Sequence, residues 1–279
     1  MELKDLERKK KKTKMKGYPQ IFELCIVESL PKGEKKTGQI LFEETIKYKK
    51  FQEPNLSSSY SEINSKKEFI DYLIKIKRRI IKDKLFPILH IETHGSENGI
   101  HLANGELYTW EEFFTETRDI NIALKNSLIL NLAMCYGISL IGKVDPIKRA
   151  PFRAVVATSK EIKWKTLLEG FEIFYDTYFF SLSARNAVIE ANKVLETEGV
   201  RFNYLQAEHF IEAFTDTTRD PVFLENMIND FAVREKATNP AFKELDFKYA
   251  YEHSKSKVMS IMEEAKNVKD FFLMKDIKK

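Results

Sequence analysis

Short apolar runs alternate with amphipathic stretches along the first two thirds of the chain. Nearly unbroken apolar runs, which are typical of strands buried on both faces of a sheet, lie at residues 21–30, 85–94, 127–134 and 152–159. A more alternating run at 39–48 predicts a further strand. The polar, serine-rich stretch that follows it is typical of a linker.

Helical periodicity appears between these runs. Residues 66–83 predict an amphipathic helix, because four apolar residues recur there at helical spacing: Phe69, Leu73, Ile76 and Ile80. Ser65 and Glu68 form the signature of a capping box at its start, and Thr109 and Glu112 form a second one. Each box predicts the first residue of a helix.

The remaining elements follow from turn and capping residues. A hairpin with a two-residue turn at Asn104 and Gly105 is predicted before the second capping box. A long helix from Trp164 and another capped by Ser183 come later. Beyond Gly199 the pattern is helical, without clear strands.

This alternation of strands and helices predicts an α/β fold. We expect a mostly parallel sheet flanked by helices, with a C-terminal helical extension. The corresponding parts are a basic disordered tail over 1–17, a globular domain over 18–200 and the helical extension over 201–279.

The positive charge is concentrated at the N-terminus. The chain has a net charge of +4, and residues 1–17 hold eight Lys or Arg against three acidic residues. The remainder is therefore nearly neutral, whereas a nucleic-acid-binding domain usually spreads basic residues over one face. A solvated tail is the favoured interpretation, and weak anion binding by the tail is the alternative.

Two cysteines, Cys25 and Cys135, are too few for a disulfide framework and form no CxxC pair. A reducing cytoplasm is the simplest setting for them. No apolar stretch approaches the roughly 20 residues that a membrane span needs, and the N-terminus lacks the apolar segment of a secretory signal. We expect a cytoplasmic protein with no membrane partner.

Two apolar runs end on reactive residues. His94 ends the run at 85–94 and is followed by Gly95, and Cys135 follows the run at 127–134. The carboxyl ends of parallel strands meet at one edge of a sheet, and neighbouring strands lie ~5 Å apart. This placement predicts that the imidazole and the thiol lie within catalytic reach of each other.

An imidazole beside a thiol can act as the general base for a nucleophilic thiolate. The backbone N–H groups of Gly95 and Cys135 are the predicted donors to the oxyanion of the tetrahedral intermediate. The alternative is that Cys135 is a small, buried apolar residue without reactivity.

A metal site is the less favoured interpretation of the same region. His90, Glu92 and His94 alternate along one strand and share a face, but the helical HExxH context of a zinc peptidase is absent. No phosphate-binding glycine loop occurs either. We therefore predict neither a metal nor a cofactor.

The segments "HIETHGSENGIHLANGELYTW", "LILNLAMCYG", "APFRAVVATSKEIKW" and "GFEIFYDTYFFSLSARNAVIEANK" resemble the CHAT-type caspase-like cysteine peptidases of the caspase, separase and legumain superfamily. The resemblance covers about residues 20–197 and is best over 86–195. It implies a caspase-like sheet, His94 as the general base, Cys135 as the nucleophile, and the amides of Gly95 and Cys135 as the oxyanion hole.

The chain also departs from that family. Met134 precedes the cysteine, where a small residue is usual, and the caspase signature Q-A-C-[RQG]-G is absent. Aspartate specificity is therefore not carried over. Glu161 and Lys163, just after the strand at 152–159, are candidates to line a primary specificity pocket. The preference for basic, acidic or apolar residues stays open.

The leading hypothesis is a cysteine endopeptidase that acts on protein substrates. Bacterial proteins that resemble it serve as effectors of anti-phage defence, which implies a separate sensor or activator protein. The runner-up is a catalytically silent caspase-like scaffold that binds a partner through its C-terminal helices. A nucleic-acid-associated protein that uses the basic tail is the third and least favoured hypothesis.

Overall fold

One eight-stranded sheet runs through the centre of the chain, with the main order β2-β1-β3-β6-β7-β8. The computed structural model describes residues 21–51, 55–217, 220–263 and 265–277, so the predicted tail at 1–17 lies outside the described residues. The strands are β1 (Ile21–Ser29), β2 (Leu56–Glu62), β3 (Leu85–Ser96), β4 (Gly99–His101), β5 (Leu107–Thr109), β6 (Ile129–Ala133), β7 (Ala154–Thr158) and β8 (Phe202–Gln206).

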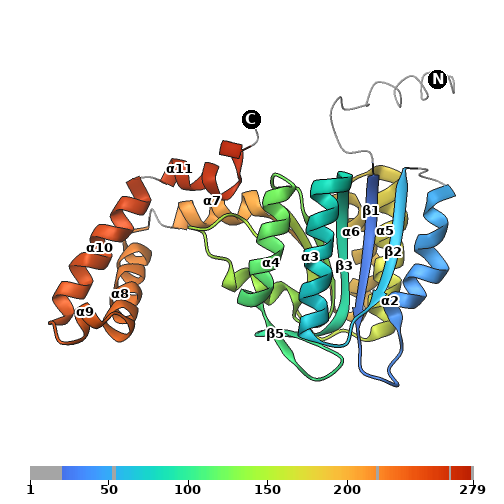
Figure 1. Ribbon diagram of the computed structural model, residues 1–279, viewed down its shortest axis with the longest axis horizontal. Helices are drawn as coiled ribbons and strands as arrows, with labels where there is room; N and C mark the ends of the chain where they lie inside the picture. The colour runs from blue at the N-terminus through green and yellow to red at the C-terminus, as the bar shows by residue number, and fades with distance from the viewer. Residues whose placement is uncertain (1–20, 52–54, 218–219, 264, 278–279) are drawn as a thin grey trace.

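Helices cover both faces of this sheet (Figure 1). Helices α3 (Lys66–Asp83) and α4 (Trp110–Ala123) pack on one face, and α5 (Trp164–Ser181) and α6 (Ala184–Leu195) pack on the other. The pairings along the path are parallel except that of β7 with β8. The predicted α/β fold, with a mostly parallel sheet flanked by helices and with C-terminal helices, is confirmed.

The sequences of the central strands are continuous apolar runs because alternate residues are buried in two cores, one on each face of the sheet. In β1, Cys25 and Val27 pack toward α3 and α4, whereas Leu24 and Ile26 pack toward α5. Both sets are almost completely buried. This two-sided burial is typical of parallel sheets covered by helices.

The prediction of a strand at 39–48 is wrong. The segment forms a short helix α2 (Thr37–Ile40), a π-helical turn (Leu41–Thr45) and a 3-10 turn (Ile46–Phe51). Leu41 and Ile46 are both buried against the α5 side, and their spacing of five residues matches one π-type turn.

The interpretation of the serine-rich stretch as a linker is also wrong, because that stretch contains the edge strand β2. Its serines are accommodated by a polar cluster. Ser59 donates a hydrogen bond to the buried carboxylate of Glu23 at 2.7 Å, and Arg79 pairs with the same carboxylate at 2.6 Å. An edge strand with polar residues thus lacks the apolar run by which the other strands were predicted.

A further strand, β8, occurs beyond Gly199, where none was predicted. It pairs antiparallel with β7 and lies past the boundary drawn at residue 200. Phe202 is fully buried, and the Asn192 side chain hydrogen-bonds to both its backbone N–H and its carbonyl, at 2.7 and 3.0 Å. These hydrogen bonds from α6 stabilise a short strand that has only a weak strand pattern in its sequence.

The predicted hairpin forms between β4 and β5, but its turn differs from the prediction. The Gly105 N–H donates to the carbonyl of Leu102 at 2.8 Å, and Gly105 has a φ of +87°. The turn is therefore a three-residue connection that ends in a left-handed glycine, and the prediction of a two-residue turn is wrong. Thr109 and Glu112 form the predicted capping box of α4.

The other two predicted N-caps, Ser65 and Ser183, also form, but the capping box at Ser65 is incomplete. Ser65 and Ser183 each accept a hydrogen bond from the backbone of the helix that follows. Glu68, however, bonds to the N–H of Asn64 rather than to that of Ser65, so the first box is only half formed.

The last third of the chain is mainly helical. Its elements are α7 (Ala207–Thr217), α8 (Pro221–Thr238), α9 (Pro240–Lys243), α10 (Phe247–Glu263) and α11 (Ala265–Phe272), followed by a 3-10 turn (Lys275–Ile277). Phe272 and Leu273 join the core on the α3 side, whereas α8, α9 and α10 project away from the sheet (Figure 1). Of the helices that the structure describes, none is long and apolar enough to cross a membrane.

Candidate active site

The predicted catalytic residues lie the same distance beyond the ladder that joins two adjacent strands. The parallel ladder between β3 and β6 ends with Glu92 opposite Ala133, and His94 and Cys135 each lie two residues further on. Both emerge at the carboxyl edge of the sheet, where ligands of parallel sheets bind.

One open pocket of about 510 Å³ lies at this edge. It is lined by His94, Gly95, Cys135, Tyr136, Glu161, Ile162 and Lys163. The structure therefore brings all five predicted site residues into one pocket, together with two that the sequence did not indicate.

Gly95 is the point of closest backbone approach in this pocket. A Cβ atom on Gly95 would lie 2.3 Å from the carbonyl oxygen of Cys135 and 2.8 Å from Cγ of Met134. No side chain fits there. The glycine thus allows the backbone next to the predicted base to lie directly against the backbone of the predicted nucleophile.

The same packing accounts for Met134, which departs from the small residue expected before the cysteine. Met134 is 1% exposed, and its side chain lies beneath both Gly95 and Gly137. A Cβ on Gly137 would approach Cγ of Met134 to 3.3 Å. Two glycines therefore provide the space that the larger side chain occupies.

A carboxylate that the sequence analysis missed holds the His94 imidazole. Nε2 of His94 lies 2.8 Å from Oε2 of Glu34, and both side chains are about half exposed. Glu34 follows β1, which pairs with β3, so its loop reaches the same edge of the sheet. Only the adjacency of these two strands in the tertiary structure identifies Glu34 as a partner of His94.

Cys135 lies at a strained turn. Its Sγ contacts the carbonyl oxygen of Ile162 at 3.9 Å, and Tyr136, the next residue, has a φ of +55°. A positive φ is rare for a bulky residue and is found at functional turns. Thr158 at the end of β7 supports the turn, since its hydroxyl donates to the carbonyl of Met134 at 2.8 Å.

His94 and Cys135 share the pocket without a mutual hydrogen bond. Within the part of the chain that the structure describes, the hydrogen-bond partner of His94 is Glu34, through Nε2. Nδ1 is the ring nitrogen that remains to accept a proton from a thiol. Hydrogen bonds between catalytic groups are often long before substrate binds.

The two predicted specificity residues differ in their electrostatic surroundings. Lys163 pairs with Glu198 at 3.4 Å, so its charge is partly compensated. Glu161 forms no ion pair with any described residue. Its negative charge is the main cause that raises the pKa of Tyr136 above its ordinary value. The pocket therefore has an uncompensated negative charge.

Two of the three residues weighed as metal ligands, His90 and Glu92, belong to a buried hydrogen-bond network, whereas His94 lies in the open pocket. His90 is fully buried, with Nε2 at 3.0 Å from Glu92 and Nδ1 at 3.0 Å from the Tyr175 hydroxyl. Asn131 donates to the same hydroxyl at 2.8 Å. Both ring nitrogens of His90 are thus used, and no group of three metal-ligating side chains occurs among the described residues.

Cys25 offers a contrast to Cys135. It is fully buried in β1, and burial, helped by the charge of Glu23, raises the pKa of its thiol to about 12. A thiol in that environment is protonated at neutral pH and inaccessible to reagents. The strand predicted for the apolar run at 21–30 is thus confirmed, and Cys25 is buried within it.

No protein-family model matches the chain, and no curated protein matches it significantly. The interpretation of the site therefore depends on its own geometry and chemistry.

Proposed function

We propose that the protein is a cysteine endopeptidase, with Cys135 as the nucleophile and His94 as the general base. One observation supports this most strongly: the two residues lie two positions beyond the end of the ladder between β3 and β6, and they line one pocket. Glu34 supplies the third component of such a site, a carboxylate that orients the imidazole. The resemblance to caspase-like peptidases assigns the same roles to His94 and Cys135.

In the proposed reaction, Nδ1 of His94 takes the thiol proton of Cys135. The thiolate then attacks the carbonyl carbon of the scissile peptide bond, and the backbone N–H groups of Gly95 and Cys135 donate to the resulting oxyanion. When the C–N bond breaks, His94 returns the proton to the leaving amine. Water, deprotonated by His94, hydrolyses the thioester and restores the thiol.

The charge of the pocket supports a preference for substrates with a basic residue before the scissile bond. Glu161 is the uncompensated charge, whereas Lys163 pairs with Glu198. A guanidinium or ammonium group would complement the Glu161 carboxylate. Of the three preferences that the sequence left open, we therefore propose the basic one.

The resemblance extends the proposal to an effector of anti-phage defence, switched on by an activator protein. In the described residues His94 bonds to Glu34 and not to Cys135, which supports a resting form that must rearrange before turnover. The loop after Cys135 and the projecting C-terminal helices are the proposed contact region for an activator.

The alternative is a catalytically silent scaffold. The same pairing of His94 with Glu34 favours it, because a scaffold has no need of a bond between His94 and Cys135. The endopeptidase proposal is preferred because a scaffold also has no need of a partly exposed thiol on a strained turn.

Comparison of new protein N-termini in expressing cells tests the proposal. Wild type should generate cleavage products that disappear with Cys135→Ala and with His94→Ala. His209→Ala, which changes an exposed histidine outside the pocket, serves as the matched control and should cleave normally. Cleavage that persists in a folded Cys135→Ala protein would support the scaffold.

A further inference from the structure

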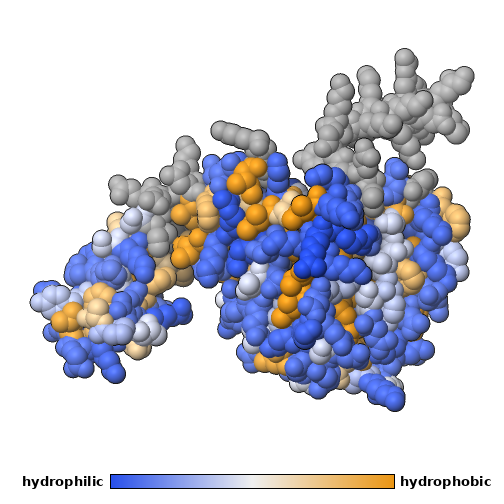
Figure 2. Space-filling view, in the orientation of Figure 1, coloured by the Kyte–Doolittle hydropathy of each residue, from blue (hydrophilic) through white to orange (hydrophobic). Residues whose placement is uncertain are grey.

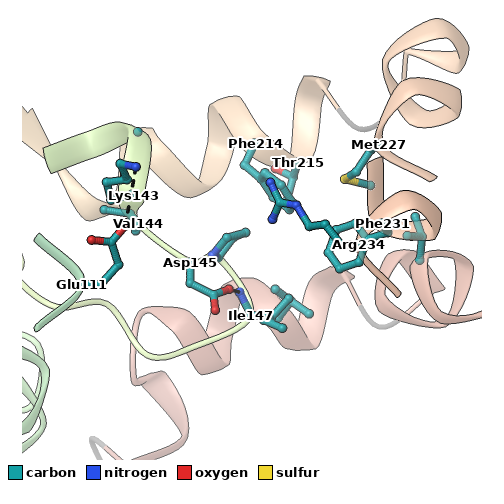
Figure 3. A pocket seen from close by; sticks show the side chains of 14 residues that line it. Glu111, Lys143, Val144, Asp145, Ile147, Phe214, Thr215, Met227, Phe231 and Arg234 are labelled. Carbon is teal, nitrogen blue, oxygen red and sulfur yellow. Dashed lines mark hydrogen bonds and ion pairs between the residues drawn. The ribbon is translucent and has the colours of Figure 1, made fainter. Parts of the chain in front are cut away.

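A second pocket, of about 550 Å³, lies where the projecting helices meet the body, away from His94 and Cys135. The segment 142–147 and Glu111 of α4 form one side, and residues of α7, α8, α10 and α11 form the others (Figure 3). Its volume falls in the range of small-molecule sites, roughly 300–1,000 Å³. Figure 2 shows hydrophobic surface at this junction, beside otherwise hydrophilic helices.

The walls are mostly apolar, and they come from separate elements. The apolar lining residues are Val144, Pro146, Ile147, Phe214, Met227, Phe231, Val258 and Val268. Several of them are only partly buried in the structure, so apolar surface remains exposed to water inside the pocket. A bound hydrocarbon chain would remove that surface from water, at about 25 cal/mol per Å².

The charged lining residues are compensated, with one exception. Lys143 pairs with Glu111 at 3.6 Å, and Asp145 pairs with Lys148 at 3.3 Å. Arg234 forms no ion pair with any residue that the structure describes. In Figure 3 its side chain reaches from α8 toward Phe214 and Thr215 of α7. The pocket thus combines apolar walls with one uncompensated guanidinium.

We propose that this pocket binds an amphipathic monocarboxylate, with its hydrocarbon chain between the apolar walls and its carboxylate on Arg234. A guanidinium matches a carboxylate with two parallel hydrogen bonds, which an alcohol or an ammonium group cannot reproduce. The occupant is a small molecule because the pocket is bounded by several elements and has the volume of a ligand site. This site does not depend on the proposed peptidase activity.

Calorimetric titration with dodecanoate, below its micelle concentration, tests the proposal on the full-length protein. Dodecanoate should bind saturably with one site per chain, and dodecanol and dodecyltrimethylammonium should bind at least tenfold more weakly. Arg234→Gln should weaken dodecanoate at least tenfold and remove its advantage over dodecanol. Arg201→Gln, which changes an exposed arginine outside the pocket, is the matched control and should bind like wild type.

Met227→Trp fills the pocket and should abolish binding of all three compounds. If that variant does not fold, the methyl resonance of Met227, assigned by comparison with Met227→Leu, provides the second measurement and should shift on titration. The proposal is overturned by the absence of saturable binding, by Arg234→Gln binding like wild type, or by a Met227 resonance that dodecanoate leaves unmoved.

Discussion

Oε2 of Glu34 lies 2.8 Å from Nε2 of His94, although 60 residues separate them in the chain. The contact exists because β1 and β3 are parallel neighbours, so the loop after β1 and the last residues of β3 reach one edge of the sheet. A carboxylate in this position holds one ring orientation and stabilises the imidazolium that forms when His94 takes a proton.

Glu34→Gln should therefore lower kcat/KM by about tenfold to a hundredfold, with a smaller effect on KM. The amide keeps the shape but not the charge, and exposure of the pair to solvent limits the effect. Hydrolysis of a small peptide substrate provides the measurement. Glu190→Gln, on the exposed side of α6, is the control and should retain wild-type kinetics. Equal rates for both variants would remove Glu34 from the site.

Gly95→Ala should destabilise the protein by about 2–4 kcal/mol and abolish activity, because the added Cβ meets the carbonyl oxygen of Cys135 at 2.3 Å. Gly142→Ala is a matched control, since its Cβ would meet no atom within 4 Å. That variant should change the free energy of unfolding by less than about 1 kcal/mol. Urea denaturation measures both, and equal effects would show that the backbone at Gly95 is not tightly packed.

The two thiols should differ in native alkylation. Cys135 is partly exposed and should react much faster than the fully buried Cys25, and His94→Ala should slow the reaction of Cys135 near neutral pH. Mass spectrometry of labelled peptides distinguishes the sites, and denaturant should bring the two rates together. Faster native labelling of Cys25 would contradict the burial of β1.

Cys25 should also make stability depend on pH. Its thiol pKa is about 12 in the folded protein against 9.0 for an unperturbed thiol, so the folded state keeps the proton longer than the unfolded state. The stability that the protonated Cys25 thiol contributes to the folded state is complete below about pH 9. It is lost progressively as the pH rises from there toward 12. The free energy of unfolding of Cys25→Ala should therefore fall less steeply than that of wild type between pH 8.5 and 10.5. In this pH window the thiol of the unfolded chain loses its proton. Parallel slopes would contradict this prediction.

Glu161→Lys should reverse the substrate preference that we propose. Wild type should cleave after arginine or lysine at least tenfold faster than after glutamate, a difference of about 1.4 kcal/mol in transition-state binding. The variant should favour the acidic substrate, because the pocket then holds two cationic side chains, Lys163 and the lysine introduced at position 161. Lys193→Glu, on the exposed side of α6, is the charge-change control. Unchanged preference in Glu161→Lys would remove Glu161 from the specificity pocket.

Local pattern alone placed His94 and Cys135 at the carboxyl ends of two strands. The apolar runs that end at His94 and directly before Cys135 were sufficient for that, since burial on both faces requires apolar residues throughout a central strand. The same reasoning identified α3, α5 and α6, whose apolar residues recur at helical spacing. It also predicted the class of fold, because alternating strands and helices leave few other arrangements.

Only the tertiary structure decided which strands are neighbours, and therefore which loops meet. The pairing of β1 with β3 brings Glu34 to His94, and the packing of Leu41 and Ile46 against the α5 side makes a helix of a segment that alternates like a strand. β2 depends on Glu23 and Arg79, and β8 depends on its pairing with β7. These partners are distant in the chain, so the residues of the two strands carry little signal of their own. Strand order and edge strands are selected by long-range packing and hydrogen bonding, which no window of local sequence contains.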